Sequence, residues 1–303
     1  MSPPTDERLG QVSAPVLSET GPSEPVLIEP RELAALLDRD RPVVLADVRW
    51  WLGGPAGRPV YEEGHLPGAQ YVDLEDELSG AHRADGAGGR HPLPDPEAFA
   101  ASMRRIGVAE QSLVVAYDAD TSLAASRLWW LLTDAGHDQV RVLNGGYAGW
   151  VAAGLPTETG PGSRVEPGTF AGEPGRRAQT DGAALVRRLA SGERPPLVDV
   201  RAGERYRGEV EPYDPIAGHI PGALNLPSAE NLADGGRFLS PSELADRFAE
   251  LDASPVLYCG SGITAAHTLL AMTVGGRTDA AIYPGSWSDW VSDPTRPVAT
   301  GSD

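Results

Sequence analysis

The chain has 303 residues, of which 41% are hydrophobic, a length and a composition that allow about two globular domains. Its formal net charge of −18 argues against nucleic acid or an anionic membrane surface as a partner, because both would repel it. The single cysteine excludes an intramolecular disulfide and a cysteine-rich metal site, and the composition indicates neither a metal nor a cofactor.

Residues 1–24 are polar and rich in proline, which predicts a disordered tail. They lack the basic and apolar regions of a secretory signal, and no apolar run of the chain is long enough for a transmembrane helix. We therefore expect a cytoplasmic protein, in which a reactive thiol is kept reduced.

Strands and helices alternate along the rest of the chain, which indicates an α/β fold with parallel sheets flanked by helices. In the first half the predicted elements are a helix around Leu33–Leu37, a strand at 43–48, a helix at 95–106 and a strand at 113–117. The second half has the same order, with a helix around Leu185–Leu189, a strand at 197–200, a helix at 241–251 and a strand at 255–258.

Sequence motifs recur in this same order, which indicates an internal duplication. The hexapeptide at 64–69, Gly-His-Leu-Pro-Gly-Ala, recurs at 218–223 as Gly-His-Ile-Pro-Gly-Ala. The first half has a longer middle segment, around 75–95, in which His91 is interpreted as a loop residue. We expect a first domain at 25–156, a linker rich in glycine and proline at 157–177, and a second domain at 178–300.

The only cysteine, Cys259, follows the last predicted strand and precedes Gly260-Ser261-Gly262 and a helix start. The carboxyl ends of parallel strands are where α/β sheets bind ligands. The glycines allow the loop to turn its N–H groups inward, and the helix N-terminus adds partial positive charge. We expect this loop to favour the thiolate and to stabilise a persulfide anion, with further donors from Ser261 and Thr264. The alternative is a buried structural cysteine.

The duplication supplies an internal comparison for this loop. Asp118 stands in the first half where Cys259 stands in the second, within the sequence Tyr-Asp-Ala-Asp-Thr-Ser. An aspartate cannot carry sulfane sulfur, and two acidic residues oppose an anion-binding loop. The first domain is therefore predicted to be inactive in sulfur transfer and to form a wall or a scaffold.

These features together resemble the rhodanese family over about residues 25–300. They are the tandem α/β repeat, the aspartate in place of cysteine in the first half, and the sequence Cys-Gly-Ser-Gly-Ile-Thr-Ala from Cys259 onward. The uncharged loop is similar to that of 3-mercaptopyruvate sulfurtransferases, whereas thiosulfate-preferring members typically carry cationic residues there. The resemblance implies that Cys259 takes sulfur from a small-molecule donor and passes it to thioredoxin, another thiol or cyanide.

The resemblance also implies roles for individual residues. Arg205 matches the family arginine that binds the anionic end of the donor, and Tyr213 stands where mercaptopyruvate enzymes usually carry a second arginine. Ser261 and His65 match a proton relay, although no acid is found near 53–56 to orient the histidine, and His65 has a turn-stabilising role as its alternative. The predicted site therefore has Cys259, Ser261 and His65 as catalytic residues, and its substrate-binding residues are Arg205, Tyr213, Gly260, Gly262, Ile263 and Thr264.

Other readings of the cysteine loop fit less well. A cysteine phosphatase needs an arginine six residues after the cysteine, where Ala265 stands, and a thioredoxin-like oxidoreductase needs a second cysteine. A thiosulfate-preferring sulfurtransferase and a non-catalytic binding module on the same fold remain as alternatives. A binding module would be expected to lose the cysteine, as the first half has.

Overall fold

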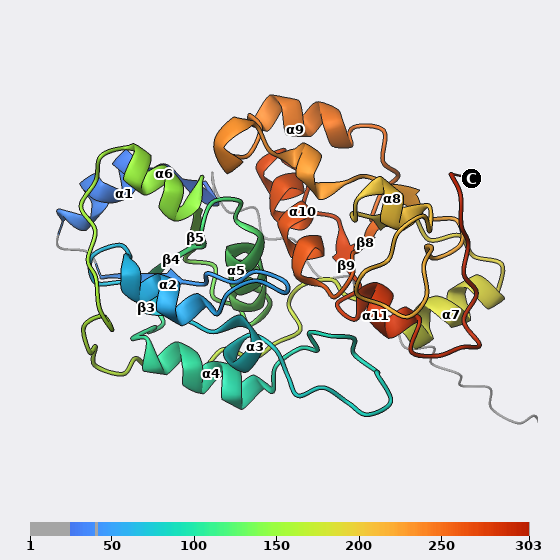
Figure 1. The fold of residues 1–303 in the computed structure, drawn as a ribbon, viewed down its shortest axis with the longest axis horizontal. Coiled ribbons are helices and arrows are strands. Elements are labelled where there is room, and N and C mark those ends of the chain that lie inside the picture. Colours follow the sequence, from blue (N-terminus) through green and yellow to red (C-terminus); the bar gives the residue numbers. More distant parts are fainter. Residues whose placement is uncertain (1–24, 40–41, 303) are drawn as a thin grey trace, which may run out of the picture.

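A computed structural model of the chain describes residues 25–39 and 42–302, so the tail predicted at 1–24 lies outside the described residues. Two α/β units lie side by side, the first drawn from blue to green and the second from yellow to red (Figure 1). No helix in the described part of the chain is long and apolar enough to cross a bilayer.

The first unit contains one sheet in which every neighbouring pair of strands is parallel, in the order β1-β5-β4-β2-β3. Its strands are β1 (Leu27–Ile28), β2 (Val43–Asp47), β3 (Gln70–Tyr71), β4 (Leu113–Tyr117) and β5 (Val140–Leu143). The central strand β4 is buried along its whole length, because helices cover both faces of the sheet. These helices are α1 (Pro30–Leu37), α2 (Gly57–Glu63), α3 (Leu74–Glu77), α4 (Pro96–Arg105), α5 (Leu123–Asp134) and α6 (Gly146–Ala152).

The second unit repeats this plan with a parallel sheet in the order β7-β6-β8-β9. Its strands are β6 (Leu197–Asp199), β7 (Leu224–Asn225), β8 (Val256–Tyr258) and β9 (Ala281–Ile282). Its helices are α7 (Gly182–Ala190), α8 (Gly203–Tyr206), α9 (Pro241–Phe248), α10 (Ile263–Val274) and α11 (Ser286–Trp290), with short 3₁₀ helices η1 (Ser228–Asn231) and η2 (Asp234–Gly236). The predicted fold class, two parallel sheets flanked by helices, is confirmed.

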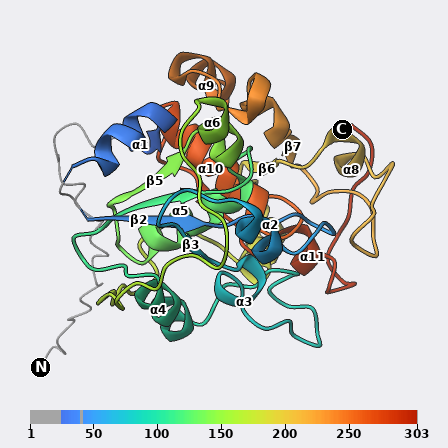
Figure 2. The same cartoon turned by 60° about the vertical axis from the view of Figure 1, so that its left-hand side comes forward.

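One hydrophobic core joins the two units. Helices α5 and α10 pack against each other in the middle of the molecule (Figures 1 and 2), and both are buried almost throughout. The core around them includes Val114 and Ala116 of the first sheet and Val198 and Leu257 of the second. Each sheet has a further core on its other face, beneath α1, α2 and α6 in the first unit and beneath α7, α8 and α11 in the second.

The recurring motifs build the same internal braces in both units. Arg49 binds Asp47 through Nε and Nη2 and reaches the carbonyl of Gly64 at 2.6 Å. Arg201 makes the equivalent bonds to Asp199 and to the carbonyl of Gly218, also at 2.6 Å. These buried pairs tie the aspartate at the end of β2 and the one at the end of β6 to the turn before the next strand, so the duplicated motifs have a structural explanation.

Candidate active site

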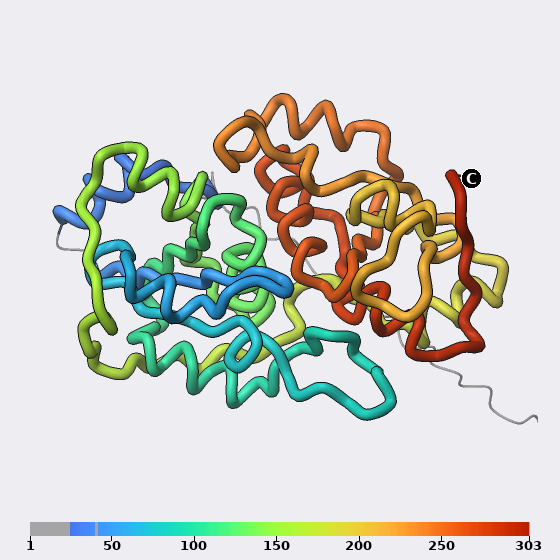
Figure 3. Tube along the Cα trace, in the orientation of Figure 1, coloured from blue at the N-terminus to red at the C-terminus, as the bar shows by residue number. Residues whose placement is uncertain are grey.

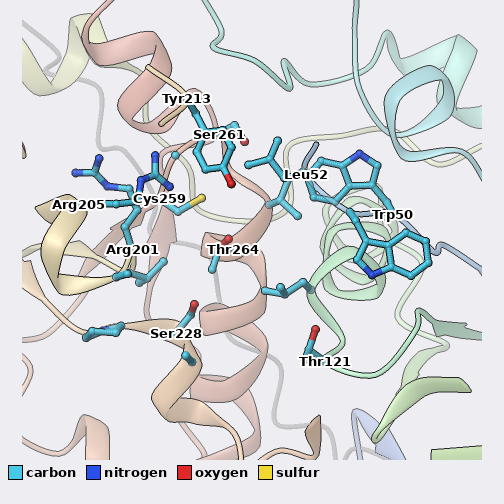
Figure 4. Close-up of a pocket in the computed structure, with 18 of the residues that line it drawn as sticks. Trp50, Leu52, Thr121, Arg201, Arg205, Tyr213, Ser228, Cys259, Ser261 and Thr264 are labelled. Carbon is cyan, nitrogen blue, oxygen red and sulfur yellow. The ribbon is translucent and has the colours of Figure 1, made fainter. Parts of the chain in front are cut away.

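A cavity of about 480 Å³ lies where the carboxyl ends of β4 and β8 face each other across the two units. Its walls come from both, with Trp50, Asp118 and Thr121 on one side and Arg201, Cys259 and Thr264 on the other. Figure 4 shows the sulfur of Cys259 beside Ser261 and Thr264, with Arg201 and Arg205 to one side and Leu52 and Trp50 to the other.

Cys259 is held by the loop between β8 and α10. The N–H of Gly262 donates to its Sγ at 3.1 Å, and its own N–H donates to Oγ of Ser286 at 3.1 Å. Gly262 has φ +85°, and a side chain there would meet the carbonyl oxygen of Pro284 at 2.3 Å, so only glycine fits this turn. An amide donor at the start of a twelve-residue helix stabilises negative charge on the sulfur.

The first unit shows what such a loop binds. The carboxylate of Asp118 accepts hydrogen bonds from the N–H groups of Asp120, Ser122 and Ala124, at 2.9–3.2 Å, and a longer one from Ala125. Burial raises the pKa of Asp118 to about 6, and the amide bonds oppose that rise. A loop of this shape thus places several amides around an anionic group on the first residue after the strand.

Ser261 is hydrogen-bonded to a histidine, but this histidine is His91. Nδ1 of His91 lies 2.7 Å from Oγ of Ser261, and its Nε2 lies 3.1 Å from Oε1 of Glu75. The same Glu75 oxygen accepts the indole N–H of Trp50 at 2.8 Å. In the neutral tautomer that satisfies both contacts, Nε2–H donates to Glu75 and Nδ1 accepts from Ser261.

The prediction that His65 occupies the relay position is corrected by this geometry. His65 is fully buried in the first unit, where Nδ1 contacts the carbonyl of Tyr61 at 2.9 Å and the ring stacks on Tyr61. His219 makes the same two contacts with Tyr206 in the second unit. Both histidines stabilise the duplicated turn, and neither lines the cavity.

His91 itself is largely buried, which decides its charge. Burial lowers its pKa below the ordinary value, while the neighbouring carboxylate of Glu75 acts in the opposite direction. The ring is therefore neutral at physiological pH and can accept a proton on Nδ1. The acid that orients His91 is Glu75, at the start of α3, and not a residue near 53–56.

The segment that carries His91 crosses from the first unit to the second (Figure 3). The N–H groups of Gly88 and Arg90 donate to Asp289 and Ser288 of α11, at 2.7 and 3.0 Å. From the first unit, Arg127 donates to the carbonyls of His91 and Pro92 at 3.2 and 3.3 Å. Burial lowers the pKa of Arg127 to about 10, so it remains a cation beneath this segment.

The predicted anion-binding residues lie at the opposite end of the cavity from Trp50. Arg205 lines it but is already paired with Glu211, through Nε at 3.2 Å and Nη2 at 2.7 Å. The ring of Tyr213 lies 5.1 Å from the Arg205 guanidinium carbon. Gly260, Ile263 and Thr264, which follow Cys259 in the loop and at the start of α10, also line the cavity.

Four residues at or beside this site were not predicted from the sequence. They are Glu75, Arg90, His91 and Arg127. The signal that could have found three of them is the length difference between the halves, because Glu75, Arg90 and His91 lie in or at the start of the extra segment of the first half. A duplicated fold does not need those residues for its core, so an insertion there points to a role at the domain interface.

Comparisons with known proteins agree with this fold. The family described as "Rhodanese-like domain" matches residues 29–153 and 182–293. A Pseudomonas aeruginosa protein named "Probable 3-mercaptopyruvate sulfurtransferase" is 46% identical over 91% of this chain and 98% of its own length. A Mycobacterium tuberculosis protein whose name includes "thiosulfate sulfurtransferase SseB" is 44% identical, again over 91% of this chain and 98% of its own length.

A solved structure agrees as well. The crystal structure of SseA from Escherichia coli, described as a 3-mercaptopyruvate sulfotransferase with the rhodanese fold, is 30% identical with a TM-score of 0.73, and the match covers 87% of this chain and 99% of that one. The chain therefore belongs to the rhodanese family, with two rhodanese-like domains. Within that family it is a sulfurtransferase of the group that uses 3-mercaptopyruvate or thiosulfate.

Proposed function

We propose that this sulfurtransferase carries sulfane sulfur as a persulfide on Cys259, taken from 3-mercaptopyruvate and delivered to a thiol such as thioredoxin or to cyanide. The observation that carries the proposal is the pair of matching loops. Asp118 keeps a fixed carboxylate among the amides of the first loop, whereas the second loop offers its amides to a cysteine that opens onto a cavity. A persulfide sulfur on Cys259 extends the side chain by one atom toward those amides.

The transfer step then conserves charge and protons. The Cys259 thiolate attacks the sulfur of the donor, the carbon–sulfur bond breaks, and its electron pair goes to the donor carbon as the enolate of pyruvate. The thiol proton of the donor ends on that carbon, which gives pyruvate and the Cys259 persulfide anion. The acceptor thiolate attacks the outer sulfur in the second half-reaction and regenerates the Cys259 thiolate, so ping-pong kinetics are expected.

Ser261, His91 and Glu75 are suited to carry that proton. Neutral His91 can take the donor proton through the hydroxyl of Ser261 and return it to the enolate carbon. Glu75 holds the ring in the tautomer with an open Nδ1 and stabilises the cation while it exists. We assign the relay to these three residues in place of His65.

The uncharged loop favours mercaptopyruvate over thiosulfate. Residues 260–264 contain no arginine or lysine, and a dianionic donor beside the thiolate would gain no cation from the loop itself. Thiosulfate remains the second candidate donor because the guanidinium groups of Arg201 and Arg205 also line the cavity. We further propose that residues 25–156 form a domain that carries no sulfur itself but supplies His91 and Glu75 to the site, joined by 157–177 to the sulfur-carrying domain at 178–300.

The test is to assay both donors with the wild type and two variants. We expect a higher kcat/KM for 3-mercaptopyruvate than for thiosulfate, and intact-protein mass spectrometry should show one added sulfur atom on Cys259. Cys259→Ser should abolish the adduct and the transfer, whereas Asp118→Ala should leave both nearly unchanged. The reverse donor ranking would refute the choice of donor, and comparable losses in both variants would refute a single active domain.

A further inference from the structure

We propose that Arg90, a residue of the first domain, binds the carboxylate of the donor together with Arg205 of the second domain, so that the substrate anion bridges the two domains. This inference rests on the proposed function and specifies how that site selects a donor that ends in a carboxylate. Arg90 lies immediately before His91, in the segment that only the first half of the chain contains.

Two guanidinium groups approach the same point of the active-site loop. A methyl group added to Gly260, the residue after Cys259, would lie 2.8 Å from Nη2 of Arg90 and 3.5 Å from Nη1 of Arg205. Both arginines line the cavity that contains the Cys259 sulfur. A carboxylate in this position would therefore contact both cations while its donor sulfur faces Cys259.

Arg90 has hydrogen-bonding capacity that the protein leaves unused. Its Nη1 pairs with Asp214, but its Nε is buried without a hydrogen-bond partner, and its Nη2 bonds to none of the described residues. Nε and Nη2 form the edge of a guanidinium that binds a carboxylate with two parallel hydrogen bonds. On Arg205 the same edge is occupied by Glu211, so Arg90 is the arginine with a free edge.

Asp214 and the second domain hold Arg90 in this position. The carboxylate of Asp214 is buried between Arg90 and Arg205, with Oδ2 lying 3.6 Å from Nη2 of Arg205. The backbone N–H of Arg90 donates to Ser288 of α11 at 3.0 Å. An ion pair on Nη1 and an anchored backbone leave the other edge of the side chain fixed, which is the condition for binding an anion at little cost in side-chain entropy.

The ring of Tyr213 lies beside both cations. Its centre is 5.7 Å from the guanidinium carbon of Arg90 and 5.1 Å from that of Arg205. A guanidinium from the first domain thus shares the face of this aromatic ring with one from the second. The second cation of the site is supplied from the other domain.

The test compares two donors that differ only in the carboxylate. Mercaptoacetone carries a methyl group where 3-mercaptopyruvate carries the carboxylate, so it cannot use Arg90 in the proposed way. For Arg90→Gln we expect KM for 3-mercaptopyruvate to rise roughly 10- to 100-fold, as for the loss of one buried charged contact, while KM for mercaptoacetone changes little. Arg90→Lys should recover part of the loss, because it restores the charge without the paired donors.

The matched control is Arg83→Gln, which removes an arginine of the same segment. Arg83 is exposed and pairs with Asp85 on the surface, away from the cavity lining, so both donors should behave as with the wild type. Equal losses for both donors in Arg90→Gln, or no loss for either, would overturn the role of Arg90, because a displaced His91 or a folding defect affects both donors alike.

A binding measurement separates this inference from the proposed function. If the wild type forms no persulfide with either donor, the proposed function fails, and calorimetric binding of pyruvate then tests Arg90 without turnover. We expect Arg90→Gln to weaken pyruvate binding about tenfold or more, whereas equal affinities would overturn the inference.

Discussion

At the scale of single residues, the site depends on a few polar side chains whose neighbours set their charge. His91 is neutral because burial lowers its pKa, and Glu75 limits that effect from 3.1 Å away. Ser261, which follows Cys259 by two residues and contacts Nδ1 of His91 at 2.7 Å, has an uncharged side chain. The pH dependence of the enzyme should therefore report His91.

Replacing Glu75 should move that pH dependence in a defined direction. Since the carboxylate raises the pKa of His91, Glu75→Gln should lower that pKa further. If neutral His91 is the proton acceptor, the fall in kcat/KM on acidification should then occur at a lower pH in the variant than in the wild type. Rate profiles measure the shift, and histidine-labelled NMR titration identifies the ring.

The control for this prediction is Glu77→Gln, which removes a second carboxylate of α3. Glu77 pairs with Arg105 on the outside of the first domain. The pH dependence of kcat/KM in Glu77→Gln should therefore match that of the wild type. If kcat/KM of Glu75→Gln instead fell at a higher pH than that of the wild type, the assigned role of Glu75 would be contradicted.

At the scale of elements, the segment between α3 and α4 brings first-domain chemistry to a second-domain cysteine. It is fixed by α11 on one side and by Arg127 of α5 on the other. Gly89 lies against the start of α11 with φ +75°, and a side chain there would meet the carbonyl oxygen of Gly285 at 2.4 Å. The segment can lie against α11 only because residue 89 is glycine.

Gly89→Ala should displace this segment and lower kcat/KM for 3-mercaptopyruvate and for mercaptoacetone alike, by about tenfold or more, because both Arg90 and His91 move. Gly154→Ala is the matched control, since Gly154 has a similar φ of +71° but open space around it. That variant should lose only roughly 1–2 kcal/mol of stability, the cost of holding an alanine in the left-handed backbone conformation, and should retain its activity. Equal activity of the two variants would show that the segment need not dock on α11.

The elements also show how far the sequence predicts this molecule. The strands at 113–117, 43–48 and 255–258 correspond to β4, β2 and β8 within a residue at each end, because apolar runs of that length are buried on both faces. The duplication also predicted that Asp118 matches Cys259. It could not predict the partner of Ser261, since His91 comes from an insertion without a counterpart. The choice of His65 came from the family resemblance, whereas its recurrence as His219 already indicated a role in the turn.

At the scale of the whole molecule, the two domains share the core between α5 and α10. Leu128 of α5 and Leu270 of α10 are both fully buried in it. Neither helix could keep its apolar surface out of water if the other domain were unfolded. We therefore expect the two domains to unfold together.

Calorimetry of the full chain should show one transition. Leu45 lies in the outer core of the first domain and Leu270 in the shared core. Leu45→Ala and Leu270→Ala should each lower the free energy of unfolding of the full chain by about 2–5 kcal/mol, seen as a shift of the one transition. Two resolved transitions, with Leu45→Ala moving only one of them, would mean that the domains are energetically independent.

The position of the cavity between the two loops has a consequence for how such a chain can change over generations. A gene shortened to the thiol-bearing half would still encode the sulfur carrier, but it would have lost the residues that choose the donor and manage its proton. Conversely, the half without sulfur chemistry cannot drift freely, although Asp118 takes the place of the cysteine after its central strand. Selection for the reaction therefore acts on both copies of the duplication, through an insertion that only one of them acquired.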